Sequence, residues 1–325
     1  MSRQHVLRLT AGLAAALLNC ATLGSAAGAQ GAQGAQGAQG AQGAQGVSRQ
    51  PDVYLASLEV AGVAVKVGTP RNITARPGYD NQPAFAPDGA SLFYTSTRED
   101  GQADIYRYDL KRDATSRVTT TAPESEYSAT VVPGGGAVSV IRVEQDSTQR
   151  LWRVPLDGSA PAVILERVKP VGYHVWADEH TLALFVLGDP ATLQLADTRT
   201  GRSDTLLANI GRSLHRIPGT AHVSFVSRAY AAIPWVMELD VVTRGVRPLA
   251  RLPEGVEDHA WLPDGRLIAG NGAKLFVCDP RTTAEWTLVA DLAAAGLGGI
   301  TRLAVSPRGD RLAIVAVPPP PNARR

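Results

Sequence analysis

Three histidines are the residues of this chain best suited to bind a metal ion or to hold a polar ligand. His174, His215 and His259 follow one another at intervals of 41 and 44 residues. Neutral imidazole nitrogens are common ligands for transition metals, and carboxylate or amide oxygens complete such sets. The carboxylate and amide side chains that we count as further candidates are Gln82, Glu257 and Asp258. These residues can form one site only if the fold brings their segments together.

Motifs of several common enzyme classes are missing from the sequence. It has no Gly-x-Ser-x-Gly elbow of the serine hydrolases. The glycine run 134–136 is better explained as a turn between strands than as a phosphate-binding loop, and the acidic residues lack the alternating spacing of a calcium loop. The formal net charge of +2 arises from interspersed charges, which argues against nucleic-acid binding.

A turn pattern repeats six times after Pro51. In each copy an apolar residue and a spacer precede a turn rich in Pro, Asp and Gly, as in Phe85–Gly89 and Trp261–Gly265. The residues that we take as equivalent in the six turns are Pro87, Pro133, Ala177, Pro218, Pro263 and Pro307. Their spacings of 46, 44, 41, 45 and 44 residues match the length of a β-propeller blade, so six turns predict six blades.

Each period also contains segments for a four-stranded antiparallel sheet. A β-rich run such as Ser91–Thr95 follows the turn, a third strand such as Asp104–Asp109 comes next, and a fourth such as Pro161–Leu165 closes the blade. No segment carries a sustained helical period, and Asp291–Gly296 is the only candidate for a short helix. The sequence therefore predicts an all-β protein.

The two ends of the repeat region each supply half of a blade. After the sixth turn there is room for only two strands before four consecutive prolines, which cannot donate to a ladder. Asp52–Leu58 and Val63–Val67 have the character of a third and a fourth strand without a first and second. We therefore expect a six-bladed β-propeller in which the N-terminal strands complete the C-terminal blade, with Tyr54 beside Leu312 and Ile314.

A propeller places equivalent residues around one axis, and its innermost strands line the central channel. The residues three positions before the aligned turn residue are Ala84, Thr130, His174, His215, Ala260 and Ala304. This alignment predicts that His174 and His215 occupy the same place in adjacent blades, with His259 one residue away. Two interpretations follow: the histidines converge on a ligand or metal, or each one satisfies hydrogen bonds in a polar channel.

Large side chains fall two positions before the turn proline and are expected to pack between neighbouring blades, as Phe85 and Trp261 illustrate. Arg216 occupies the same repeat position, but a charged arginine side chain is not expected to pack between two blades. Either blade four is shifted by one residue, or this position is functional.

The Pro-Asp-Gly turns, together with Leu92–Ser96 and Asp104–Leu110, resemble the repeats of TolB-like β-propellers, and the spacing extends the resemblance over about residues 52 to 317. The resemblance implies a fold and an exported protein, but no partner, because the N-terminal α/β domain of TolB has no counterpart here. Some TolB-like propellers are polysaccharide lyases that hold manganese with channel histidines and a glutamine. For this chain, that likeness implies His174 and His215 as ligands, completed by His259 or Asp258.

The N-terminus has the features of an export signal, which we place at residues 1–29. Basic residues precede the apolar stretch Leu9–Ala27, and small residues allow cleavage after Ala27 or Ala29. The alternative is a lipoprotein signal with Cys20 lipidated, although Asn19 is unusual there. We predict a Gly-Ala-Gln linker at 30–50, the propeller at 51–318 and a proline-rich tail at 319–325.

These observations favour a periplasmic, envelope or secreted propeller that binds a protein or small ligand on one face without catalysis and without a cofactor. A metal-assisted enzyme, such as a lyase acting on an acidic polysaccharide, is the alternative, and its metal would be a transition metal in the channel. A tethered envelope scaffold is the third hypothesis. We expect a monomer with no transmembrane segment in the mature protein. The residues expected to bind the ligand are Gln82, His174, His215, Asp258 and His259.

Overall fold

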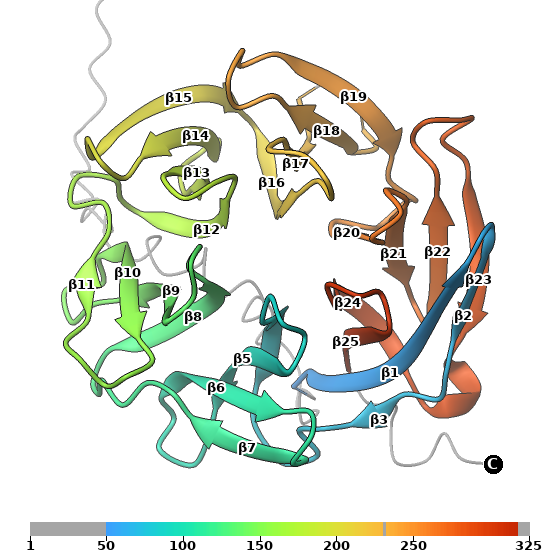
Figure 1. The fold of residues 1–325 in the computed structure, drawn as a ribbon, viewed down its shortest axis with the longest axis horizontal. Coiled ribbons are helices and arrows are strands. Elements are labelled where there is room, and N and C mark those ends of the chain that lie inside the picture. The colour runs from blue at the N-terminus through green and yellow to red at the C-terminus, as the bar shows by residue number, and fades with distance from the viewer. Residues whose placement is uncertain (1–49, 230–231, 318–325) are drawn as a thin grey trace, which may run out of the picture. The chain divides into compact units, whose positions relative to one another are not determined.

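The computed structural model describes residues 50–229 and 232–317. In these residues the strands form six antiparallel sheets that surround one central axis like the blades of a propeller (Figure 1). The predicted export signal, the lipidation candidate Cys20, the Gly-Ala-Gln repeats and the C-terminal tail lie outside the described residues.

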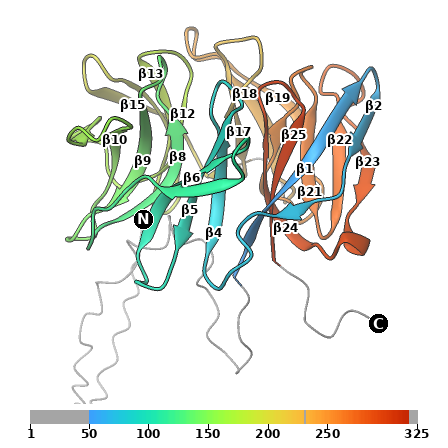
Figure 2. The same cartoon turned by 60° about the horizontal axis from the view of Figure 1, so that its bottom comes forward.

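Five blades are built from consecutive strands, and in each the first strand is the innermost one (Figures 1 and 2). Blade 1 consists of β4 (Asp80–Phe85), β5 (Ser91–Thr97), β6 (Ala103–Asp109) and β7 (Ala114–Arg117). Blade 2 consists of β8 (Ser125–Val131), β9 (Ala137–Val143), β10 (Gln149–Pro155) and β11 (Ala162–Val163). Blade 3 consists of β12 (Val171–Trp176), β13 (Thr181–Val186), β14 (Thr192–Asp197) and β15 (Arg202–Ala208). Blade 4 consists of β16 (Ile210–Arg216), β17 (Val223–Ser227), β18 (Trp235–Leu239) and β19 (Val246–Arg251). Blade 5 consists of β20 (Ala260–Trp261), β21 (Leu267–Asn271), β22 (Lys274–Cys278) and β23 (Trp286–Asp291).

The sixth blade, called the closing blade below, joins the two ends of the repeat region. Its strand order is β24 (Gly298–Val305), β25 (Arg311–Val317), β1 (Asp52–Ala61) and β2 (Ala64–Val67), and β3 (Arg71–Asn72) pairs with β1. In the β1–β25 ladder Tyr54 lies opposite Ile314 and Ala56 opposite Leu312. The predicted closure of the ring is confirmed.

The Pro-Asp-Gly turns work as the sequence predicts, because their glycines adopt a conformation that other residues rarely reach. Gly89 and Gly309 both have φ near +70°, and each donates its N–H at 2.9 Å to the carbonyl three residues earlier. This geometry returns the chain from the innermost strand to the second strand of each blade.

The core lies between the blades, in six apolar clusters that each join one pair of neighbours. Trp261 packs in the cluster between blades 4 and 5, and Phe85 packs in the cluster between the closing blade and blade 1. The expectation that large side chains at this repeat position pack between blades is confirmed for both. Each blade is therefore held by two neighbours, and the inner strands keep fixed positions around the axis.

Two local predictions were wrong in extent. The fourth strand expected at Pro161–Leu165 is reduced to Ala162–Val163, and the short helix expected at Asp291–Gly296 is a three-residue 3₁₀ turn, Ala293–Ala295. Both segments lie at the outer edge of their blades, where few neighbours fix the backbone. In the described part of the chain, no helix combines the length and apolar character needed to cross a membrane.

Candidate functional site

Hydrogen bonds across the six turns show which residues are equivalent from blade to blade. In every blade the residue that follows the innermost strand donates its N–H to a carbonyl on the other side of the turn. The six donors are Ala86, Val132, Ala177, Ile217, Leu262 and Ser306. In blade 3 the residue after this donor is Asp178, so Asp178 stands where the other blades carry proline. The predicted alignment, which used Ala177, was wrong by one residue because blade 3 has no proline to mark its turn.

The corrected alignment changes which two of the three histidines occupy equivalent positions. His174 and His259 occupy the same position, three residues before the donor, whereas His215 lies one residue further along its strand. The prediction paired His174 with His215 and set His259 apart. The one-residue shift in the alignment therefore lies in blade 3 and not in blade 4. Arg216 of blade 4 shares its repeat position with Phe85 and Trp261, as the sequence alignment had it.

His174 and His259 each belong to a hydrogen-bonded network that links two blades. Ser139 of blade 2 lies 2.7 Å from His174 Nε2 and accepts a 2.9 Å hydrogen bond from Trp176 Nε1 of blade 3. The same network recurs between blades 4 and 5, with both contacts at 2.8 Å; its members are Ser224, His259 and Trp261. Because these imidazoles link neighbouring blades through hydrogen bonds, their main role is to stabilise the fold.

Burial keeps both imidazoles neutral. It lowers the pKa of His174 to about 3. It also lowers the pKa of His259 well below the usual value, with a further lowering from His215 and an opposing effect of Asp258. Neutral histidines with satisfied Nε2 atoms fit the interpretation that they satisfy hydrogen bonds in the interior.

Acidification is expected to weaken the fold through His174. The unfolded chain binds a proton near pH 6.5 and the folded chain only near pH 3, so the free energy of unfolding falls as pH decreases between these values. His174→Asn should remove about 1 kcal/mol per pH unit of this dependence between pH 6 and 5. Urea denaturation at several pH values measures it, with the exposed His180 as control in a His180→Gln variant. An unchanged slope in His174→Asn would refute the assignment.

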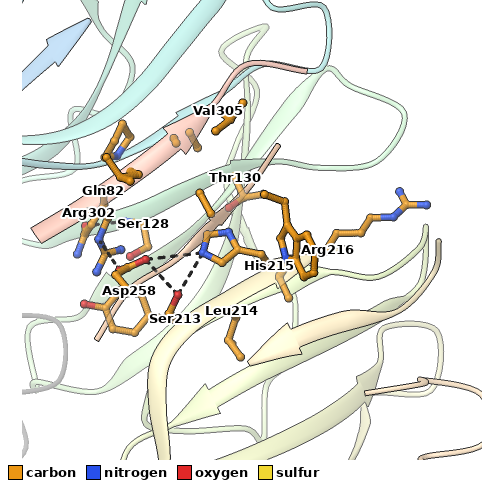
Figure 3. Close-up of a pocket in the computed structure, with 18 of the residues that line it drawn as sticks. Gln82, Ser128, Thr130, Ser213, Leu214, His215, Arg216, Asp258, Arg302 and Val305 are labelled. Carbon is orange, nitrogen blue, oxygen red and sulfur yellow. Dashed lines mark hydrogen bonds and ion pairs between the residues drawn. The ribbon is translucent and has the colours of Figure 1, made fainter. Parts of the chain in front are cut away.

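A cavity of about 570 Å³ lies on the axis and is lined by all six blades (Figure 3). Two rings of equivalent residues form much of its wall, since side chains two apart on a strand share a face. The ring four residues before the turn donor consists of Gln82, Ser128, Tyr173, Ser213, Asp258 and Arg302. The ring two residues before it consists of Ala84, Thr130, Val175, His215, Ala260 and Ala304. The first of these is called the polar ring below.

The cavity extends from the polar ring to the face on which the turns lie. Pro218, Gly219, Pro263 and Pro307 of three turns also line it. They lie five or more residues along their strands from the polar ring, or roughly 16 Å at the usual strand rise. A ligand that enters from this face therefore meets the ring with Ala84, Ala260 and Ala304 before it reaches the polar ring.

Asp258 is the centre of the charged part of the polar ring (Figure 3). One carboxylate oxygen lies 3.5 Å from Arg302 Nε, and the other accepts a 3.0 Å hydrogen bond from Ser213 Oγ and lies 3.8 Å from His215 Nε2. Burial opposes ionisation of Asp258, but Arg302, His215 and Arg212 outweigh it and hold the pKa at about 2. The group is therefore an aspartate anion at neutral pH.

Ser213, His215 and Asp258 do not have the geometry of a nucleophilic triad. In such a triad the acid orients one imidazole nitrogen and the serine meets the other. Here Ser213 Oγ and Asp258 both approach the same atom, His215 Nε2, at 3.2 and 3.8 Å. The Ser213 hydroxyl also hydrogen-bonds to Asp258 Oδ1 and lies 3.0 Å from His259 Nδ1, so these side chains do not form the acid–histidine–serine relay of a triad.

The structure brings together only part of the predicted site. Gln82, His215 and Asp258 line the cavity, and His174 lies in its wall. Within the described residues His259 is not part of the cavity lining, because its imidazole bonds to Ser213 and Ser224.

Glu257, the remaining acidic candidate, lies on the far side of the polar ring. There it lines a second cavity of about 190 Å³ and pairs with Arg228 at 2.7 Å. Its carboxylate is half exposed and does not face the larger cavity.

The predicted manganese-type ligand set does not fit this arrangement. His174 and His259 use Nε2 for the links between blades, and only His215 of the three lies on a channel-facing ring. Among residues 50–229 and 232–317, no group of three or more His, Cys, Asp or Glu side chains is placed to hold a metal ion.

Arg212 and Arg302 are the site residues that the sequence analysis missed. Both line the larger and the smaller cavity, and Arg216, which the sequence had singled out, lines the larger one. Arg302 also lies over the ring of Tyr173 at 5.0 Å. Arg302 shares its repeat position with Asp258 and Gln82, and the predicted alignment was correct for these three blades, so the repeat position alone could have identified it.

Solved structures show what this architecture resembles. A TolB-type protein from Agrobacterium tumefaciens superposes with a TM-score of 0.62 at 15% identity, covering 84% of this chain and 100% of that one. TolB from Acinetobacter baumannii superposes with a TM-score of 0.54 at 12% identity, covering 82% of this chain and 63% of that one. The fold is that of the TolB-like six-bladed propellers. No protein-family model matches the chain.

The TolB-like fold is shared by proteins of different function. An oligogalacturonate lyase, solved in complex with manganese, superposes with a TM-score of 0.53 at 16% identity, covering 77% of this chain and 80% of that one. At such identities the likeness is one of fold alone. The chain spans less than two thirds of the Acinetobacter TolB, and what its own propeller does must be argued from its cavity.

Proposed function

We propose that this chain is an exported TolB-like propeller that binds a small ligand in its axial cavity and does not transform it. The observation that carries the proposal is the cavity of about 570 Å³ to which every blade contributes equivalent residues. Its volume is in the usual range of small-molecule sites, and its wall combines apolar residues such as Ala84, Val175 and Ala304 with a polar ring, as such sites do.

The proposal of binding without catalysis is supported by the chemistry of the wall. Ser213, His215 and Asp258 lack the arrangement of a triad, and Asp258 is a paired anion with a pKa of about 2, too acidic to accept a proton at neutral pH. A metal-assisted reaction would need a ligand set that the cavity lining of the described chain does not offer.

Export is the second part of the proposal, and it rests on the N-terminal sequence. Basic residues, the apolar stretch Leu9–Ala27 and the small residues after it favour a cleaved signal and a periplasmic or secreted protein. The mass of the mature N-terminus in the native host tests this part. A start at residue 28 or 30 is expected, and an intact N-terminus would refute export. A lipidated Cys20 would refute the cleaved signal and identify a lipoprotein signal instead.

Filling the cavity tests ligand binding. Ala304→Trp places an indole in the wall and should abolish binding of those members of a small-molecule library that bind the wild-type protein, as ligand-observed NMR would show. Val63→Trp is the matched control, because Val63 lies in an exposed hairpin at 94% exposure. Unchanged binding in Ala304→Trp, or no binding by the wild type, would overturn the proposal. Incubation with each bound compound should leave it chemically unchanged.

A further inference from the structure

Positive charge dominates the axial cavity. The charged side chains that line it, apart from the histidines, are Arg212, Arg216, Arg302 and Asp258. Arg216 lies near the turns and is exposed, whereas Arg212 and Arg302 lie at the level of the polar ring. The deep end of the cavity thus carries two guanidinium groups and one carboxylate.

Asp258 cannot neutralise both guanidinium groups. It lies against Arg302, whose side chain is only 15% exposed, and it also interacts electrostatically with Arg212. Burial disfavours the charged form of Arg302, but Asp258 together with Tyr173 and Tyr79 outweighs burial and raises the pKa of Arg302. One positive charge at this depth is left without a counter-charge, and a poorly solvated cation without an anion is costly.

Unpaired polar atoms mark the same region. Among the described residues that line the cavity, four have a buried polar atom without a hydrogen-bond partner: Arg212 Nε, Ser128 Oγ, His174 Nδ1 and Asp258 Oδ2. Of these atoms, Asp258 Oδ2 faces a cation, Arg302 Nε, at 3.5 Å. His174 is only 7% exposed. In the equivalent pair, Ser213 Oγ and His259 Nδ1 lie 3.0 Å apart. The corresponding atoms of Ser128 and His174 do not bond to each other.

We infer that the ligand of this cavity carries a carboxylate, which Arg212 and Arg302 bind at the polar ring. This inference rests on the proposed ligand binding and names its chemistry. A guanidinium group matches a carboxylate through two parallel hydrogen bonds, and Arg212 still has a donor to offer. The two arginines and Asp258 together carry one net positive charge, which a carboxylate neutralises. A phosphate dianion would leave an excess negative charge.

The location favours a small molecule over the surface of a folded protein. The polar ring lies roughly 16 Å from the turns at the mouth, and a side chain on a folded partner does not span that depth. The ring that includes Ala84, Ala260 and Ala304 has small side chains there, which leave space for an apolar part of the ligand above the carboxylate.

A matched pair of probes tests the inference: N-acetylalanine, which has a carboxylate, and N-acetylalaninamide, its neutral analogue. By isothermal titration calorimetry or NMR titration of the full chain, the acid should bind at least tenfold more tightly than the amide. Methyl phosphate should bind more weakly than the acid. Arg212→Gln should weaken binding of the acid about tenfold. Arg244→Gln, the control at an arginine that pairs with Asp204 outside the cavity, should change it less than threefold.

Each contrary outcome has a separate meaning. Equal binding of acid and amide, tighter binding of methyl phosphate, or full affinity in a folded Arg212→Gln variant overturns the carboxylate assignment. If both probes bind equally but lose binding in Ala304→Trp, the cavity is a ligand site of another chemistry, and only the proposed function survives. If neither probe binds, the carboxylate inference is wrong. Circular dichroism of each variant confirms that it is folded.

Discussion

Val53→Asp is expected to unfold the protein or to cost about 4 kcal/mol or more of its free energy of unfolding. Val53 is fully buried in the cluster between the closing blade and blade 1, and it lies opposite Val315 in the β1–β25 ladder. A carboxylate there has no partner and breaks the contact that closes the ring. Urea denaturation followed by circular dichroism measures the loss.

Val63→Asp is the matched control for this substitution. Val63 follows β1 in the hairpin to β2 and is 94% exposed, so the same change should alter stability by less than about 0.5 kcal/mol. If Val53→Asp behaved like Val63→Asp, β1 would not be an integral strand of the closing blade.

Asp258→Asn should have the second largest effect, a loss of about 3–5 kcal/mol. The substitution keeps the shape of the side chain but removes the only acidic charge that lines the larger cavity in the described chain. Arg302 would then lose the acid that it pairs with, and Arg212 would lose an acid with which it interacts electrostatically. Chemical denaturation at pH 7 gives the free-energy difference.

Glu257→Gln provides the comparison at the neighbouring residue. Glu257 is half exposed and pairs with Arg228 at the surface, so its neutralisation should cost at most about 1 kcal/mol. Adding Arg302→Gln to Asp258→Asn should recover part of the lost stability, because the double variant removes one unpaired cation. Equal effects of Asp258→Asn and Glu257→Gln would contradict the buried ion pair.

The architecture could be predicted from sequence because its signals are local and repeated. Turns such as Phe85–Gly89 recur with blade-length spacing, and the strand counts at the two ends require one shared blade. Edge elements such as Ala162–Val163 were less predictable, since tertiary packing does not fix them as strongly.

The site was only partly predictable because it depends on register within one strand. Gln82 and Asp258 were identified as candidates, but the missing proline in blade 3 shifted His174 by one residue. A shift of one residue moves a side chain to the other face of its strand. Arg302 was missed because histidine chemistry, rather than the repeat position, guided the choice.

Disulfide trapping across the β1–β25 ladder tests the central claim, that the N-terminal strand completes the ring and so sets the cavity. Ser57 and Arg311 are paired in this ladder, next to the hydrogen bond from Leu58 N to Asp310 O, which places their side chains close together. With Cys20 and Cys278 replaced by alanine, Ser57→Cys with Arg311→Cys should form an intramolecular disulfide almost completely under mild oxidation, as peptide mass spectrometry would show. Ser57→Cys with Ala313→Cys, two residues out of register, should form little. No disulfide in the first pair, or equal amounts in both, would contradict the closed ring.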